Sequence, residues 1–158
     1  MDINDIMTPV ESGHPVDVLF GVKTLDKRQQ GILDKLPMYG SRAVIRKKDA
    51  SMLDLSALTA ATGDEFAMFT HKSERLIIRG NSIRVPIDVD DAEELYSLGY
   101  RWSGHTHPGV TSATLIPSDG DMAVLDAFQQ KYSAIYNSTG KFKMVIRSDE
   151  NEMESEGR

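Results

Sequence analysis

The sequence predicts an α/β protein in which helices cover both faces of a mixed β-sheet. Segments with helical spacing of apolar residues alternate along the chain with short apolar runs typical of strands. The chain of 158 residues suits one domain with one buried core. Its 40% hydrophobic and 27% charged residues are typical of a soluble globular protein. We expect an irregular N-terminal extension over 1–20, a single domain over 21–147 and an acidic, disordered tail over 148–158.

Two helices and three strands are predicted in the first half of the domain. A helix over 25–36 follows Thr24 as its N-cap, and its apolar positions recur at helical spacing up to Pro37. The elements that follow are a strand over 42–46, a helix over 55–61 capped by Asp54 and ended by Gly63, and strands over 65–70 and 75–79 that form a hairpin. Residues 82–87 could continue the sheet.

Two helices and three strands are also predicted in the second half. A helix over 90–98 carries acidic residues in its first turn, where the helix dipole favours them. A strand over 100–106 leads to Pro108, and a second helix starts at Ser118. The last two strands, over 133–136 and 141–146, flank a turn at 137–140.

Composition excludes several classes of function. The chain has no cysteine, so disulfides, thiolate nucleophiles and Cys-ligated metals are ruled out. The net charge of −6 is concentrated in the last ten residues; the remainder carries 17 Lys and Arg against 19 Asp and Glu, which gives no electrostatic case for nucleic-acid binding. The sequence offers no membrane span and no leader segment, so we expect no membrane partner and a cytoplasmic location; secretion by a route that needs no leader would leave no mark in the sequence.

The segment from His105 to Asp121, HTHPGVTSATLIPSDGD, carries the main functional signal. Side chains alternate along a strand, so His105 and His107 should point to the same side at its end, where two imidazoles could bind one metal ion. A His-x-His pair alone more often marks two surface histidines. Ser118 followed by Asp121 also has a purely structural interpretation, because this spacing is typical of a helix capping box. The two interpretations are compatible, since a rigid first turn would hold Asp121 in a fixed position.

Taken together, these residues resemble the motif of the JAMM (JAB1/MPN/Mov34) metalloproteases. His105-Thr-His107-Pro108, the ten residues 108–117, and Ser118-Asp-Gly-Asp121 match that motif in identity and spacing. The resemblance covers roughly residues 55–146 and implies the layered JAB/MPN fold, similar to that of cytidine deaminases. It implies that His105, His107 and Asp121 bind one Zn²⁺ per chain and that Ser118 stabilises the tetrahedral intermediate. It also requires a glutamate as general base on a strand that follows a helix, and Glu65 fits this position better than Glu74, Glu93 or Glu94.

The expected function is therefore zinc-dependent hydrolysis of a peptide or isopeptide bond, such as removal of a ubiquitin-like tag or a role in a phage or toxin system. The expected partner is an extended peptide or the C-terminal tail of a protein substrate, held beside an exposed strand edge. The alternative is a non-catalytic binding or assembly module of the same fold. Such modules typically lose metal ligands, whereas this chain has the full set. A zinc deaminase is excluded because its cysteine ligands are missing.

Overall fold

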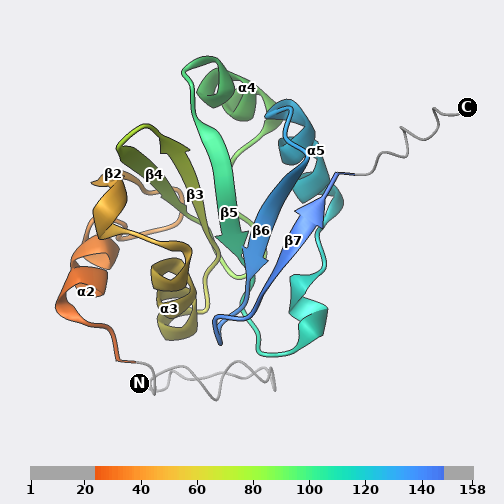
Figure 1. The fold of residues 1–158 in the computed structure, drawn as a ribbon. Helices are drawn as coiled ribbons and strands as arrows, with labels where there is room; N and C mark the ends of the chain where they lie inside the picture. Colours follow the sequence, from red (N-terminus) through yellow and green to blue (C-terminus); the bar gives the residue numbers. More distant parts are fainter. Residues whose placement is uncertain (1–23, 148–158) are drawn as a thin grey trace, which may run out of the picture.

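A computed structural model describes residues 24–147 as an α/β fold built on one mixed sheet of six strands (Figure 1). The predicted fold class is confirmed. The N-terminal extension over 1–20 and the acidic tail over 148–158 lie outside the described residues. Among residues 24–147, no helix is long and apolar enough to cross a bilayer.

The strand order places the functional segment at the centre of the sheet. The order is β2-β4-β3-β5-β6-β7, and all neighbours are antiparallel except β5 and β6, which are parallel. The strands are β2 (Arg42–Arg46), β3 (Phe66–His71), β4 (Glu74–Arg79), β5 (Arg101–Thr106), β6 (Tyr132–Tyr136) and β7 (Phe142–Ile146). The parallel pair requires a crossover connection, and that connection carries the 108–121 segment.

Helices cover both faces of the sheet, each over its own apolar core (Figure 1). The helices are α2 (Lys27–Asp34), α3 (Met52–Thr62), α4 (Val89–Ser97) and α5 (Asp119–Ala127), with 3₁₀ turns η3 (Lys47–Asp49) and η4 (Ser112–Leu115). Helices α2 and α3 pack on one face, over Phe66 and Met68. Helices α4 and α5 pack on the other, over Ala67 and Phe69. Successive β3 residues thus alternate between the two cores, as both-sided coverage requires.

Three local details differ from the sequence-based expectations. Helix α2 is capped by Asp26 rather than Thr24, and α3 by Ser51 rather than Asp54. In both cases the residue three positions further on completes a reciprocal capping box, which satisfies two backbone donors instead of one. The expected continuation of the sheet over 82–87 was wrong. There Asn81 accepts hydrogen bonds from the Ile83 and Arg84 amides and folds the chain into a turn.

A β-bulge in β5 sets the orientation of the site. Met68 pairs with Gly104 but Phe69 pairs with Trp102, so Ser103 is an extra residue that faces no β3 residue in the strand register. Strict alternation would place Trp102 and His105 on opposite faces. The extra residue reverses the alternation of side chains between the two faces. Trp102 and His105 therefore both lie on the α5 side, where their rings stack with centroids 5.0 Å apart.

Asp54 joins the first two helices. It accepts the Ser51 amide at the start of α3, two bonds from the Arg28 guanidinium at 2.6 and 2.8 Å, and one from Gln29. Burial alone would raise the pKa of Asp54, but these hydrogen bonds outweigh burial and lower it. The ionised carboxylate therefore stabilises the contact between α2 and α3.

We predict that Asp54→Asn lowers the free energy of unfolding by about 1 to 2 kcal/mol at pH 7, because Arg28 remains partly exposed and solvent screens the pair. The folded-state pKa of Asp54 is lowered, so its contribution is complete above the unfolded-state value of about 3.9 and is lost as the pH falls further. Urea unfolding at pH 7 and pH 3 checks this.

Asp126→Asn is the matched control, since Asp126 makes an exposed ion pair with Arg147 and its loss should change little. A deficit of Asp54→Asn that stays constant from pH 7 to pH 3 would contradict the assignment of its effect to the ionised carboxylate.

Candidate metal centre

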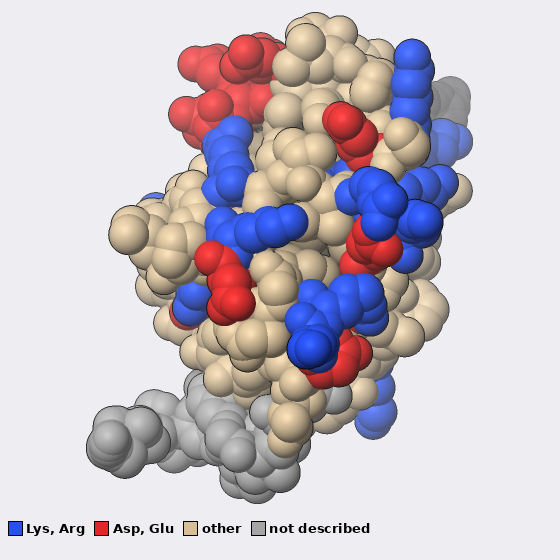
Figure 2. Space-filling view, turned by 90° about the vertical axis from the view of Figure 1, so that its left-hand side faces the viewer, with Lys and Arg blue, Asp and Glu red and all other residues tan. Residues whose placement is uncertain are grey.

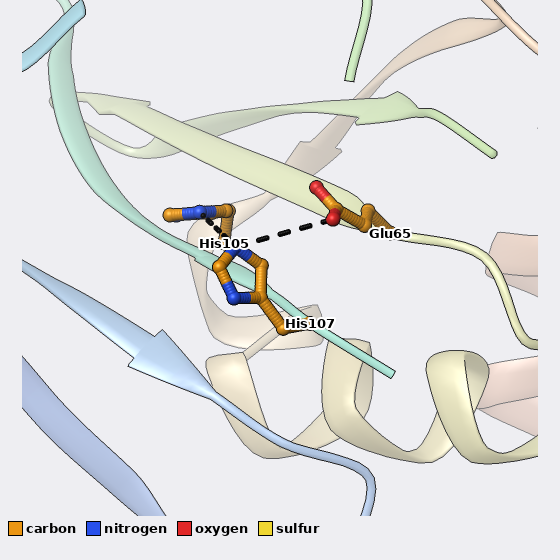
Figure 3. A group of neighbouring side chains, drawn as sticks. All are labelled: Glu65, His105 and His107. Carbon is orange, nitrogen blue, oxygen red and sulfur yellow. Dashed lines mark hydrogen bonds and ion pairs between the residues drawn. The ribbon is translucent and has the colours of Figure 1, made fainter. Parts of the chain in front are cut away.

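Four acidic and imidazole side chains from different parts of the sequence converge in one pocket. Glu65 immediately precedes β3, His105 lies near the end of β5, His107 follows β5, and Asp121 lies in the first turn of α5. Figure 3 shows Glu65, His105 and His107 pointing toward one another. Together with Asp121 they line a pocket of about 460 Å³, and Ser118 lines the same pocket. The structure thus brings together all five residues singled out from the sequence.

The group could hold a metal ion. Glu65, His105 and His107 offer donor atoms that lie within 4.8 Å of one another, and all three side chains are largely buried. The tightest cluster includes Asp121. His105 Nε2 and His107 Nε2 lie 3.0 Å apart, and Asp121 Oδ2 lies 3.2 Å from the first and 3.4 Å from the second. Donors bound to one tetrahedral zinc ion at about 2.1 Å lie about 3.4 Å from one another. The triangle therefore has nearly the size that zinc requires.

The orientation of His107 is fixed by a bond to the backbone. Its Nδ1 lies 2.7 Å from the Thr114 carbonyl oxygen, which can only accept, so Nδ1–H donates and Nε2 presents its lone pair to the pocket in the neutral ring. Gly109 makes this contact possible. Its φ is +137°, and a side chain there would collide with Thr114, so only glycine lets the loop fold back onto His107.

His105 is held by packing. Its side chain is only 3% exposed and stacks on Trp102, while Nδ1 has no hydrogen-bond partner among the described residues. Burial lowers the pKa of His105, partly offset by Asp121, and so favours the neutral ring. A neutral, immobile imidazole with Nε2 directed at the pocket is a suitable metal ligand.

Asp121 has a second role as part of a helix cap. The Ser118 hydroxyl oxygen accepts the Asp121 amide at 3.0 Å, and Asp121 Oδ2 accepts the Ser118 amide at 2.9 Å. The capping box predicted from the sequence is therefore present, and the same carboxylate oxygen faces both imidazoles. Burial would raise the pKa of Asp121, but imidazoles protonated at Nε2 in the metal-free site hydrogen-bond to the carboxylate, His105 and His107 both contributing, and hold its pKa well below its usual range.

Glu65 is pinned by its backbone and buried at its carboxylate. Its amide donates to the Asn81 carbonyl and its carbonyl accepts the Gly80 amide, which fixes it at the base of the 81–87 loop. Burial raises the pKa of Glu65 to about 7, with the charge of His107 opposing this and that of Asp121 adding to it. The other candidate glutamates lie away from the pocket. Glu74 starts β4 at the far end of the hairpin, and Glu93 and Glu94 are exposed on α4.

Without a cation this cluster would be unfavourable. Two imidazole lone pairs and two carboxylates meet in a partly buried space, where unpaired charge is costly. One response is for a ring to take up a proton. Burial lowers the pKa of His107, but Asp121 and Glu65 outweigh burial and raise it. The other response is to bind a metal ion, which all four donors can approach.

The sequence did not single out Thr106, although it connects the parts of the site. It is fully buried on the α3 side of β5, and its hydroxyl accepts the Phe66 amide at 2.9 Å and shares a hydrogen bond with Thr59 at 2.5 Å. Thr106, which lies between the two histidines, therefore ties the end of β5 to the backbone next to Glu65. The only signal for Thr106 in the sequence was its position between His105 and His107, which places its side chain on the opposite face of the strand.

The contribution of the 81–87 loop to the pocket wall was also missed. The residues of this loop that line the pocket are Ile83, Arg84, Val85 and Ile87. Ile83 is 74% exposed at the mouth. The pocket is therefore lined by apolar side chains of this loop as well as by the polar start of α5.

Comparison with known proteins adds no relative to this picture: the chain matches no protein-family model, and no curated protein or solved structure is significantly similar to it.

Proposed function

We propose that this protein is a zinc-dependent hydrolase that cleaves a peptide or isopeptide bond. The observation that carries the proposal is the triangle formed by His105 Nε2, His107 Nε2 and Asp121 Oδ2, with a buried glutamate beside it in an open pocket. Two histidines and one carboxylate leave a fourth tetrahedral position, as catalytic zinc sites do. Imidazole ligands favour zinc over magnesium or calcium.

The distances support different roles for the two carboxylates. Asp121 Oδ2 lies 3.2 and 3.4 Å from the imidazole nitrogens, as a third ligand should. Glu65 Oε2 approaches His107 Nε2 only to 3.9 Å. We therefore assign Asp121 as the ligand and Glu65 as a group that stands one water molecule away from the metal.

Glu65 suits the role of general base. Zinc in this site would lower the pKa of a water molecule toward neutrality and polarise the scissile carbonyl. Glu65 would take a proton from that water and pass it to the leaving amine. Without metal, burial raises the pKa of Glu65 to about 7 and so favours the protonated carboxyl. This suits a general base, because the base must hold the proton briefly before passing it on.

Ser118 can combine capping with catalysis. Its oxygen accepts the Asp121 amide, which leaves the hydroxyl proton free to point into the pocket. That proton could stabilise the negative charge that develops on the substrate oxygen. The structural and functional interpretations of Ser118 therefore do not compete.

The pocket suits an extended peptide that enters between the 81–87 loop and the start of α5. The expected addition of a strand to the sheet needs correction, because β3 and β5, which flank the site, are both interior strands. The free edges of the described sheet are β2 and β7. Side chains such as Ile83 at the mouth would therefore contribute more to substrate binding than sheet hydrogen bonds.

We predict about one zinc ion per chain in the purified protein, measured by elemental analysis after dialysis against metal-free buffer. His107→Ala and Asp121→Ala should each lose most of it, because each removes one of three protein ligands. His71→Ala is the control, since His71 lies at the far end of β3 and packs on Tyr100. Equal zinc content in all four proteins would contradict the site.

We predict that Glu65→Gln keeps its zinc but loses peptide cleavage by roughly 10²-fold or more, because the amide cannot accept the proton. A library of extended peptides, incubated with the zinc-loaded protein and followed by mass spectrometry, supplies the assay. Glu74→Gln should cleave as wild type does. Cleavage by Glu65→Gln at the wild-type rate would show that the base lies elsewhere.

Ser118→Ala should lower turnover by roughly 10²–10³-fold through loss of the oxyanion donor and lower stability by about 1 kcal/mol through loss of the cap. Ser118→Asp separates the two effects, because aspartate can cap the helix but has no proton to donate. We expect it to restore the melting temperature and not the turnover. Recovery of both would assign Ser118 to capping alone.

A further inference from the structure

A second pocket lies at the opposite end of the β3–β4 hairpin from Glu65. It has a volume of about 600 Å³ and is lined by the end of β2, the start of η3 and the hairpin turn, namely Arg46, Lys47, Lys48, Ser73, Glu74 and Arg75. Strand β3 separates it from the metal centre by roughly 20 Å, at about 3.3 Å per residue. A hydrogen bond from the Lys47 amide to the Ser73 carbonyl, 2.7 Å long, joins its two walls.

The pocket has an excess of positive charge. Four of its six lining residues are Lys or Arg and one is acidic. Arg46 is neutralised by Asp49 at 2.8 Å, whereas no carboxylate of the described residues lies within 4 Å of the Lys47, Lys48 or Arg75 side-chain nitrogens. Figure 2, which faces the β2 edge, shows Lys and Arg side chains spread over the middle of this surface, with Asp and Glu side chains interspersed among them.

Arg75 provides an independent argument. It alternates with Leu76 along β4 and so lies on the α2 and α3 side of the sheet, where its neighbour in register is the buried Ile45. Its Nε is buried with no hydrogen-bond partner, and its Nη1 contacts only the sulfur of Met68 at 2.9 Å. Burial lowers the pKa of Arg75, which reflects the cost of placing the charge there. A bound anion would offset that cost.

We propose that this pocket binds a phosphate group. The guanidinium of Arg75 would supply a planar fork, Lys47 and Lys48 would supply flexible ammonium groups, and the Ser73 hydroxyl would be a further donor. A phosphate offers more acceptor oxygens than a carboxylate and a charge close to the two that the pocket leaves unbalanced after Glu74 is counted. Glu74 also lines the pocket, but it lies opposite Arg46 in the strand register and points to the other face from Arg75, so it lowers the net charge without occupying the Arg75 side.

The test measures binding of inorganic phosphate and pyrophosphate to the full-length protein by calorimetry, after treatment with EDTA and at constant ionic strength set with NaCl. We expect pyrophosphate to bind more tightly than phosphate. Arg75→Gln should weaken it about tenfold or more, and the double variant Lys47→Gln, Lys48→Gln by a similar factor. Lys131→Gln, an exposed lysine that does not line the pocket, is the charge-matched control and should bind as wild type does.

The double variant keeps the proposal testable if Arg75→Gln fails to fold, since Lys47 and Lys48 are exposed. Titration with a nucleoside diphosphate distinguishes the source of the phosphate, because tighter binding than pyrophosphate would show that the organic part contributes. His107→Ala should bind as wild type does, which separates this site from the metal centre. The proposal would be overturned if the wild-type protein bound no pyrophosphate. It would also be overturned if the control Lys131→Gln lost as much affinity as the double variant Lys47→Gln, Lys48→Gln.

Discussion

One extra residue in β5 determines how the candidate metal centre is built. Without the bulge at Ser103, the strand could place either Trp102 or His105 on the α5 side of the sheet, but not both. With it, the indole forms a wall on which the His105 ring stacks, and the imidazole nitrogen points at α5. The remaining features of the site, the loop that holds His107 and the helix that carries Asp121, are arranged around that fixed ring.

The first turn of α5 is used twice. Ser118 and Asp121 satisfy each other's backbone amides, and the same two side chains border the pocket. Because each side chain serves both purposes, a capping box and a candidate metal motif can occupy the same four residues without conflict. The hydrogen bonds of the cap hold the carboxylate still, and a carboxylate held still is a better ligand than a mobile one, because less side-chain freedom is lost on binding.

Local patterns in the sequence predicted the fold class, the order of the elements and the residues that meet at the site. Spacing in the 105–121 segment was sufficient because both histidines lie at one strand end and the cap fixes Asp121. Contacts between distant residues could not be predicted in this way. The bulge depends on the register between β3 and β5, the Thr106 bonds join three elements, and Arg28 reaches Asp54 across 26 positions. The 82–87 segment was misassigned because its apolar residues line the pocket, and Val85 and Ile87 pack against the core, without pairing as a strand.

The order in which the four donors occur along the chain has a consequence for folding. His105 and His107 are neighbours in sequence, but Glu65 joins them only when β3 has paired with β5, and Asp121 only when the crossover to β6 has closed and α5 has docked. These are non-local contacts, whose loop-closure entropy must be overcome before they form. A partly folded chain in which these contacts have not formed therefore presents a two-histidine site of low affinity. Tight metal binding becomes possible only once the central sheet is complete, so that the ion would be acquired by the finished fold and would not direct its assembly.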